Sequence, residues 1–310
     1  MDVSLICPCY NSASTLPRLI SSLEKQDFEG EAEFIFVLDP SHDSSKAILS
    51  SCPAPSFRLI ANEERKGVVA SRMQGIEAAK GAYVGFVDAD DFLEPDFLSK
   101  MVAALKDNDA DAVNCSFYIK DNKKEFAYPF ARQGVYSREE GIKKLLMDCS
   151  VRGFLWCKMF KRELLLSKPL LLFPSGHGFE DMPYCFSAFA KAKKIVCLKA
   201  PLYHYSKEDQ LSISSRKNPN RAQEHLDSFA CMRAYCEYTN EKNLLKCFLA
   251  SKGRSKLTLS FDLSKSEKDG LSKAEAKRIS KEFALIYKKG KIDFSSLSVF
   301  PLIEKALIKD

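Results

Sequence analysis

The chain has 310 residues, 45% of them hydrophobic and 28% charged, so it can bury a large core and is near the size at which chains divide into domains. No run of 18 apolar residues occurs, because Ser167, Lys168 and Pro169 interrupt the most apolar stretch, and we expect no membrane span. The net charge of +6 lies toward the C-terminus, where residues 241–291 hold 14 basic and 6 acidic side chains. The few aromatic residues in this segment suit buried helix faces, which argues against nucleic-acid binding.

The basic segment at 241–291 has two interpretations. Most such charge forms a solvated face, and the functional alternative is peripheral contact with an anionic membrane surface. The eleven cysteines are odd in number and include no C-x-x-C pair, so we expect a reduced, cytoplasmic protein. The N-terminal MDVSLICPCYN lacks the basic region of a signal peptide. Membrane contact would therefore place the protein at the inner face of the membrane.

Strands and helices are predicted to alternate along the first 120 residues. Apolar runs predict the strands, and apolar residues at helical spacing predict the helices between them. In chain order the predicted elements are a strand at 3–9, a helix through Leu16, Leu19, Ile20 and Leu23, a strand at 34–38, a helix after Ser44, a strand at 57–61, a helix through Val68, Val69, Met73 and Ile76, a strand at 83–87, a helix at 97–105 and a strand at 112–118. Nearer the C-terminus, Ser272 and Glu275 form a capping box that opens a helix through Tyr287, and 297–308 is predicted to be a final amphipathic helix.

This alternation predicts an α/β fold with a mainly parallel central sheet, helices on both faces, and a helical C-terminal appendage. In such sheets ligands bind outside the carboxyl ends of the strands. Polar residues follow four predicted strand ends, namely Asn11, Asp39, Asn62 and Asp88. We therefore expect these residues to converge on one crevice.

The stretch FVDADD at 86–91 places Asp88, Asp90 and Asp91 at the end of a buried strand. Neither G-x-G-x-x-G nor a P-loop occurs, so a bound diphosphate would need its charge compensated in another way. Carboxylate oxygens suit Mg²⁺ or Mn²⁺, which can bridge to a diphosphate. The alternatives are a solvated turn, or Asp91 as a cap of the helix near Pro95.

Several motifs together resemble family 2 glycosyltransferases of the GT-A fold. ICPCYN is similar to the family's V-x-I-P-x-Y-N, VLDPSHDSS to its V-D-D-G-S-x-D-x-S, and the segment from Asn62 to Asp91 to its N-x-G-x-x-x-A-R-N-x-G and L-D-x-D-D motifs. Less specific similarity continues through LWCKMFKRELL, FEDMPYCF and PLYHYSKEDQLSIS. The resemblance implies a GT-A domain at 1–215, with a nucleotide-sugar half at 1–110 and an acceptor half at 111–215, followed by a helical, basic region at 216–310.

The resemblance also implies a nucleotide-sugar site. Asp39 would contact the nucleotide base, Arg72 would lie near the diphosphate, and Asp90 would be the main ligand of Mn²⁺ or Mg²⁺, with Asp88 and His204 as further ligands. The full nucleotide-sugar set is Pro8, Tyr10, Asn11, Asp39, Asn62, Arg72, Asp88 and Ala89. Two departures from the family pattern, Leu38 in place of an acid and Pro40 in place of glycine, remove a carboxylate and stiffen the loop.

The acceptor side is implied by residues further along the chain. Asp181 would be the general base, with Glu180 beside it, and Trp156, Lys158 and His177 would contact the acceptor. Other roles remain open: Asp39 as a cap, Arg72 in an ion pair with an acid, Glu180 and Asp181 as an acidic first helical turn, Trp156 as a packing residue and His204 as a hydrogen-bonded residue.

The expected activity is transfer of a hexose or N-acetylhexosamine from a nucleotide-diphosphate donor, by preference a UDP-sugar, with inversion. The acceptor would be a saccharide or a lipid-linked saccharide, in surface polysaccharide or glycolipid assembly. The alternative is a noncatalytic nucleotide-sugar-binding protein with the same fold, which has lost turnover through its altered loop at Leu38 and Pro40.

Overall fold

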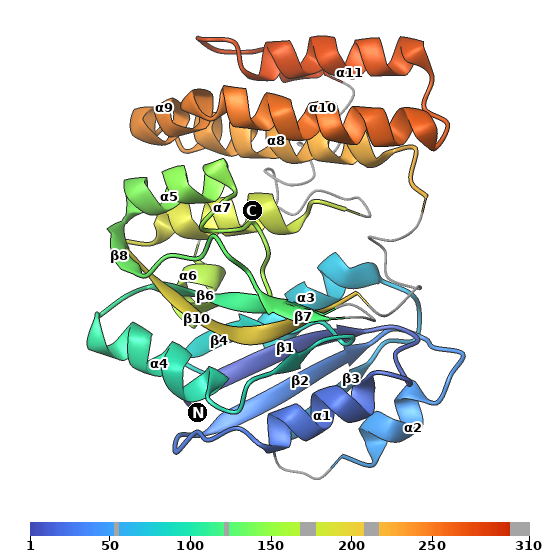
Figure 1. Cartoon of the computed structure of the whole chain (residues 1–310), viewed down its shortest axis with the longest axis vertical. Helices are drawn as coiled ribbons and strands as arrows, with labels where there is room; N and C mark the ends of the chain where they lie inside the picture. Colours follow the sequence, from blue (N-terminus) through green and yellow to red (C-terminus); the bar gives the residue numbers. More distant parts are fainter. Residues whose placement is uncertain (53–55, 121–123, 168–177, 208–216, 298–310) are drawn as a thin grey trace. The chain divides into compact units, whose positions relative to one another are not determined.

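The computed structural model describes residues 1–52, 56–120, 124–167, 178–207 and 217–297 (Figure 1). The chain divides into two compact units, each assembled from separate stretches of sequence. Unit 1 comprises Met1–Tyr136, Phe154–Ser167 and Ala192–Asp209, and unit 2 comprises Ser137–Gly153, Lys168–Lys191 and Gln210–Asp310.

Unit 1 is built on a ten-stranded sheet in which β3, β2, β1, β4, β9, β6, β10 and β5 are successive neighbours, with β7 beside β6 and β8 beside β10. Its strands are β1 (Val3–Cys9), β2 (Ala32–Leu38), β3 (Phe57–Ala61), β4 (Tyr83–Phe86), β5 (Phe92–Leu93), β6 (Ala112–Lys120), β7 (Glu125–Ala127), β8 (Gly134–Ser137), β9 (Lys158–Lys161) and β10 (Lys194–Ser206). Its helices are α1 (Leu16–Glu24), α2 (Ser45–Ser50), α3 (Gly67–Ala78), α4 (Phe97–Asp107) and α6 (Arg162–Leu166).

Helices cover both faces of the sheet because the strand residues alternate between two cores. One face of β1 carries Val3, Leu5, Cys7 and Cys9, which form a single buried cluster with apolar residues of α1 and α4. The other face carries Ile6, against which α3 packs so closely that a Cβ on Gly75 would lie 2.3 Å from the Ile6 side chain. The predicted placement of helices on both faces is confirmed.

The sheet is parallel in its first half and mixed beyond it. β1 pairs in parallel with both β2 and β4, and β2 with β3. Further along, β9 lies antiparallel between β4 and β6, and β5 pairs antiparallel with β10, although β6 and β10 are parallel to each other. Parallel pairing thus dominates where strands alternate with helices, and antiparallel pairing enters where short strands return without a crossover helix.

Unit 2 is helical. It contains α5 (Arg138–Met147), α7 (Asp181–Lys191), α8 (Arg221–Tyr238), α9 (Lys242–Ala250), α10 (Lys252–Lys268), α11 (Lys273–Ile286) and the short 3₁₀ helix η2 (Phe294–Ser296). α8 packs against α7, α9, α10 and α11. The capping box of Ser272 and Glu275 at the start of α11 is confirmed, whereas the helix predicted at 297–308 lies outside the described residues except for Leu297.

The two units interleave along the sequence, and the boundary near residue 215 remains a prediction. α5 and α7, which belong by sequence to the predicted acceptor half, pack with the C-terminal helices, and the two halves proposed for 1–215 remain a prediction. Among the described residues, no helix has both the length and the apolar character that crossing a bilayer requires.

Candidate active site

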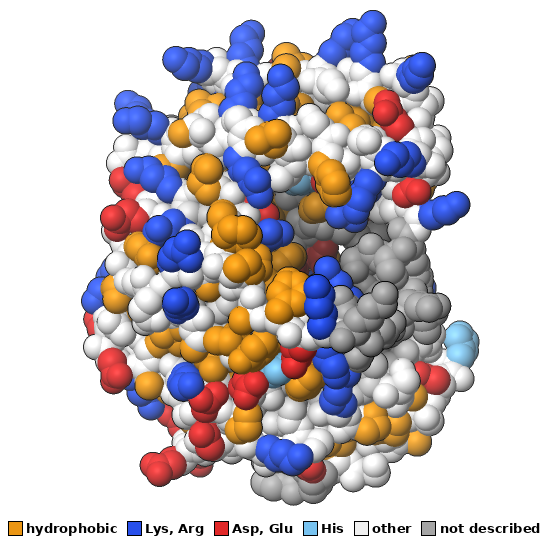
Figure 2. Space-filling view, viewed as in Figure 1, with side chains coloured by type: hydrophobic (Ala, Val, Ile, Leu, Met, Phe, Trp, Pro, Cys, Tyr) orange, Lys and Arg blue, Asp and Glu red, His pale blue; other side chains and the backbone are white. Residues whose placement is uncertain are grey.

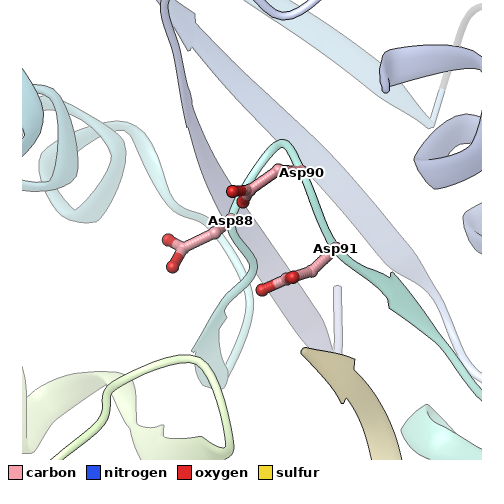
Figure 3. Close-up of side chains that lie close together, drawn as sticks. All are labelled: Asp88, Asp90 and Asp91. Atoms are coloured by element: carbon pink, nitrogen blue, oxygen red, sulfur yellow. The ribbon is translucent and has the colours of Figure 1, made fainter. Parts of the chain in front are cut away.

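Three carboxylates converge at the turn that follows β4. One oxygen from each of Asp88, Asp90 and Asp91 lies within 4.8 Å of the others. Asp88 and Asp90 are partly exposed, whereas Asp91 is fully buried. Figure 3 shows Asp88 on the first arm of the turn, Asp90 near its tip and Asp91 on the arm that leads into β5. The cluster therefore offers two carboxylates to a ligand and keeps the third inside the protein.

The buried Asp91 fastens the turn to β10. The Tyr203 hydroxyl donates to Asp91 Oδ2 at 2.6 Å, and the Ser206 amide donates to Oδ1 at 2.8 Å. Burial and the neighbouring charges of Asp90 and Asp88 raise the pKa of the Asp91 carboxyl well above its usual range. The alternative of Asp91 as a cap near Pro95 is wrong, because its acceptors are used on β10 and the residue before α4 is Asp96.

Tyr203 also accepts a hydrogen bond from the Asp88 amide, with its oxygen 3.1 Å from the nitrogen. One hydroxyl group thus holds both ends of the acidic turn. Burial, followed by the charges of Asp91 and Asp88, raises the pKa of Tyr203, so the hydroxyl keeps its proton as a donor.

Two arginines bring positive charge to the turn. Arg72 on α3 is buried, and its Nη2 lies 3.1 Å from Asp88 Oδ1. The Arg18 guanidinium on α1 donates to the Asp90 carbonyl at 2.7 Å and lies over the Phe92 ring. The ion-pair role left open for Arg72 is confirmed, and its partner is itself a residue of the acidic turn.

The loops after β1, β2 and β3 meet at the same edge of the sheet, as predicted. Asn11, which has a positive φ of 48°, donates through its amide to Ser41 and accepts from the His42 amide. Asn62 donates to Asp39 Oδ1 at 2.9 Å, which joins the loops after β3 and β2.

Asp39 holds the start of α3. Its Oδ2 accepts from the amides of Lys66 and Gly67, at 3.2 and 2.8 Å, while its Oδ1 accepts from Asn62. The carboxylate thus caps a helix that comes later in the chain. The alternative left open for Asp39, a cap of the helix after Ser44, is not what the structure shows, because the bonded amides belong to the start of α3. The preceding Leu38, which replaces the family's acid, is buried in the core cluster.

The remaining predicted nucleotide-binding residues differ in exposure. The Tyr10 ring is 36% exposed, with the Arg65 guanidinium 4.2 Å from its centroid. Pro8 is half-buried and Ala89 is buried. Tyr10 and Arg65 are thus the side chains at this edge that offer a flat surface to a ligand.

The structure does not bring His204 to the acidic turn. Its Nε2 lies 2.7 Å from Glu94 and its Nδ1 lies 2.6 Å from Glu125, and its ring is stacked between those of Phe92 and Tyr118. Because both nitrogens are occupied, the prediction of His204 as a metal ligand is corrected to a hydrogen-bonded residue that links β10 to its neighbours.

Trp156 and Lys158 are packing residues in this structure. Trp156 is 3% exposed and stacks on Phe154, Tyr203 and Tyr205. Lys158 is fully buried, and its Nζ donates to the Phe154 carbonyl at 2.6 Å. The prediction that these two side chains contact the acceptor is corrected, because neither presents a surface to it.

The other acceptor-side residues belong to unit 2. Asp181 is the first residue of α7 and Glu180 precedes it, so both also fit the acidic first turn of a helix. His177 lies outside the described residues. The roles of Glu180, Asp181 and His177 remain predictions.

Sequence reasoning missed Tyr203, Arg18 and Arg65. Arg65 and Tyr203 lie inside segments that resemble the family, namely the segment after Asn62 and PLYHYSKEDQLSIS, but at positions to which no role was assigned. Arg18 lies on a helix outside every motif.

The donor set of the acidic turn fits a hard divalent cation. Asp88 and Asp90 supply partly exposed carboxylate oxygens, and the nearby arginines leave the turn with less than its full negative charge. Mg²⁺ and Mn²⁺ are commonly bound through one or two carboxylates together with phosphate oxygens. This chemistry suggests use of a divalent metal.

Comparison with known proteins identifies the family. The model described as "Glycosyl transferase family 2" matches residues 4–166, just over half of the chain. EpsH of Bacillus subtilis (strain 168) is 31% identical over 208 residues, covering 66% of this chain and 60% of EpsH. A cholesterol galactosyltransferase of Borreliella burgdorferi is 31% identical over 206 residues, covering 62% of this chain and 56% of that protein. The chain thus spans about 60% of the length of these relatives.

Solved structures share the fold. S. aureus TarS 1–349 in complex with UDP-GlcNAc superposes with a TM-score of 0.65 at 20% identity, covering 93% of this chain and 72% of that one. The mannosyltransferase PcManGT of Pyrobaculum calidifontis, in complex with GDP-Man and Mn²⁺, gives a TM-score of 0.56 at 19% identity, covering 93% and 81%. With its sheet, its acidic turn and these matches, the chain has the GT-A fold and belongs to glycosyl transferase family 2.

Proposed function

We propose that the chain is an inverting glycosyltransferase that transfers a hexose or N-acetylhexosamine from a UDP-sugar to a saccharide or lipid-linked saccharide. The acidic turn carries the proposal: partly exposed Asp88 and Asp90 lie beside Arg72 at the edge where the loops of the parallel strands meet. The UDP-GlcNAc complex of TarS supports the donor class, and the name of the Borreliella relative supports glycolipid assembly.

Residues of unit 1 would hold the donor. Tyr10 offers its ring to the base, and Asn11, Asn62 and Asp39 form the hydrogen-bonded loops around it. Arg72 is aimed at the turn where the diphosphate would lie. A divalent cation held by Asp88 and Asp90 would supply Lewis-acid stabilisation of the negative charge that grows on the leaving diphosphate.

Residues of unit 2 would act on the acceptor. As the bond between the sugar and the diphosphate weakens, the anomeric carbon becomes electron-poor and an acceptor hydroxyl attacks it from the opposite face. The hydroxyl must lose its proton to a carboxylate, and Asp181, with Glu180 beside it, is the proposed base. One base and a single displacement give inversion.

The first experiment is calorimetric titration of UDP, GDP and CDP, each with and without Mn²⁺, into the wild type and Asp90→Ala. We expect Mn²⁺-dependent binding of UDP that falls by about tenfold or more in the variant, because a charged ligand of the diphosphate's cation is lost. Asp43→Ala is the matched control, since Asp43 accepts from backbone amides in the loop and lies outside the acidic turn. Equal binding by the wild type and Asp90→Ala would refute the proposed role of the turn.

The noncatalytic alternative rests on Leu38 and Pro40 in the loop after β2. It predicts nucleotide binding without turnover. Release of UDP from a UDP-sugar by the wild type, abolished in Asp181→Asn while UDP binding persists, would exclude it.

A further inference from the structure

In unit 2 a cluster of side chains packs around Phe179, which lies two residues before the proposed base. The Phe179 ring stacks on the His225 ring of α8, with centroids 4.2 Å apart and planes 5° from parallel. The Arg221 guanidinium, one turn earlier on α8, lies 5.1 Å from the centroid of the same ring. Phe179 stands two residues before Asp181, so the ring is fixed at the point where the chain enters α7.

The cluster is itself held together by one buried carboxylate on α10. Asp262 Oδ2 lies 2.7 Å from His225 Nδ1, and Asp262 Oδ1 accepts from Arg221 Nε at 2.6 Å. Burial raises the pKa of Asp262, but the hydrogen bonds and charges of His225 and Arg221 outweigh it, and the net shift is downward. Asp262 is therefore a charged anchor that orients both side chains beneath Phe179.

The face of His225 is supported further by Phe229, whose ring centroid lies 4.4 Å away. α8 and α10 are joined nearby by the Ala222 amide, which donates to the Ser266 hydroxyl. The imidazole thus cannot easily turn away from Phe179, since its nitrogen and its ring contacts both fix its orientation.

The backbone conformation of Phe179 indicates that these contacts to its ring are needed to hold the residue in place. Its φ is +60°, a conformation that is rare for a bulky residue and persists only where surrounding contacts impose it. The left-handed residue redirects the chain immediately before Glu180 and Asp181. Without the ring contacts, the chain would relax toward ordinary backbone angles and the first turn of α7 would shift.

We propose that Arg221, His225 and Asp262 are positioning residues which, through the Phe179 ring, orient the carboxylates of Glu180 and Asp181 for deprotonation of the acceptor. This inference rests on the proposed function of Asp181 as the base. The C-terminal helices α8 and α10 would then contribute to the chemical step through the Phe179 ring.

The test compares Phe179→Ala, Phe179→Gly, Phe179→Tyr and His225→Ala in the full chain. The assay measures nucleotide release with water as the acceptor, from whichever of UDP-GlcNAc, UDP-glucose and GDP-mannose the wild type turns over. We expect Phe179→Ala, Phe179→Gly and His225→Ala to lower kcat by about 10²-fold with the donor KM unchanged, because small misplacements of a reacting group cost about that much. Phe179→Tyr keeps the ring and should retain wild-type kcat.

A second readout does not depend on activity. Amide hydrogen exchange at 179–184 should be faster in Phe179→Ala and His225→Ala than in the wild type, while exchange in β1 stays the same. The double variant Phe179→Ala with His225→Ala should show the same loss of kcat as either single variant, because each substitution removes the same contact between the two rings. Phe130→Ala, at an exposed ring of unit 1, is the control for loss of a phenyl ring.

Two outcomes would overturn the inference. Full kcat in Phe179→Gly would mean that the backbone conformation matters and the grip on the ring does not. Wild-type kcat in His225→Ala, with Asp181→Asn inactive, would remove the cluster from the mechanism and leave the proposed function intact. Undiminished turnover in Asp181→Asn would instead refute the base itself.

Discussion

Tyr203 is the residue that most constrains the acidic turn, through its hydroxyl group. The hydroxyl oxygen accepts a hydrogen bond from the Asp88 amide and donates one to the Asp91 carboxylate. A single oxygen on β10 thus joins the segment after β4 to the segment before β5. The Asp91 carboxyl and the Tyr203 ring are fully buried, where an unsatisfied polar group is costly.

Removal of that oxygen should therefore be measurable. We expect Tyr203→Phe to lower the free energy of unfolding by about 1–3 kcal/mol, since a buried carboxyl and an amide lose their shared partner. Urea denaturation followed by circular dichroism measures the change. Tyr118→Phe is the control, because the Tyr118 ring stacks on His204 at a neighbouring position of the same sheet. Equal stability of Tyr203→Phe and the control would contradict this account.

The residues that sequence reasoning misplaced share one property. Trp156, Lys158 and His204 all lie on strands or beside them, and strand pattern does not reveal which partner each side chain meets. His204 meets Glu94 and Glu125, which are 110 and 79 residues away in the chain. Asp88 and Asp39 were placed correctly at the strand ends because the carboxyl edge of a parallel sheet is fixed by topology alone.

At the scale of the elements, every strand and helix predicted between residues 3 and 120 is confirmed. The alternation of apolar runs with helical spacing predicts these elements because most of them bury an apolar face, as β1, β2 and α4 do. β5 and the pairing of β9 could not be predicted, since a two-residue strand has no pattern and antiparallel insertion depends on segments far along the chain.

The packing of α3 on β1 depends on the absence of a side chain at Gly75. We expect Gly75→Ala to destabilise the protein by about 1–3 kcal/mol, because its Cβ would meet Ile6 Cγ2 at 2.3 Å. Gly253→Ala near the start of α10 is the matched control: an added Cβ there meets nothing within 4 Å, and a gain of up to about 1 kcal/mol is expected. Thermal unfolding of both variants should give shifts of opposite sign. If Gly253→Ala were also destabilised, the lower stability of Gly75→Ala could not be assigned to the packing of α3 on β1.

α8 carries a carboxyl group whose titration should be visible in the stability. Burial, together with Glu282 and Glu224, raises the pKa of Asp227 to about 6, although Gln223 and Arg278 oppose the shift. The folded state then holds a proton that the unfolded chain releases near pH 4, so this residue's contribution to stability is present below about pH 4 and is lost as pH rises through 6.

Asp227→Asn should therefore stabilise the protein only at higher pH. We expect a gain of about 2 kcal/mol at pH 7.5 and none at pH 4, because the amide keeps the acceptor for Gln223 and carries no charge. Melting temperatures of the variant and the wild type across this range measure the difference. A gain that is independent of pH would assign the effect to packing.

At the scale of the whole molecule, the division into units was the least predictable feature. The periodicity of α5 and α7 shows that each helix has an apolar face but does not name the partner of that face. Their partners are the C-terminal helices, so a truncation at residue 215 would strip α5 and α7 of the helices that cover them. Neither unit is a continuous segment that could be separated by one cut.

Peripheral contact with an anionic membrane, one of the two interpretations of the basic segment at 241–291, would use the surface of unit 2. Figure 2 shows Lys and Arg side chains gathered over the C-terminal helices in this view. Leu257 and Phe261 on α10 are 68% and 61% exposed, and the Lys265 ammonium lies 4.8 Å from the Phe261 centroid. Exposed apolar side chains set among lysines suit an anionic lipid surface.

We expect the double substitution Leu257→Ser and Phe261→Ser to weaken binding to phosphatidylglycerol vesicles by at least about fivefold, because buried apolar area contributes to such binding. Added salt should weaken the wild type further by screening. Vesicle sedimentation measures both effects, and Phe130→Ser, at a side chain of unit 1 that is 52% exposed, is the control. Unchanged binding of the double variant would favour the solvated face.

The capping of α3 by Asp39 limits how donor choice could be engineered. The carboxylate that would face the nucleotide base also holds the amides of Lys66 and Gly67, and the same helix carries Arg72 to Asp88. A substitution at Asp39 meant to admit a different base would loosen the helix and, through it, the arginine at the acidic turn. Redesign of nucleotide preference should begin at Arg65 and Tyr10. These two side chains contact each other, and their substitution would leave the hydrogen bonds between Asp39 and the start of α3 unchanged.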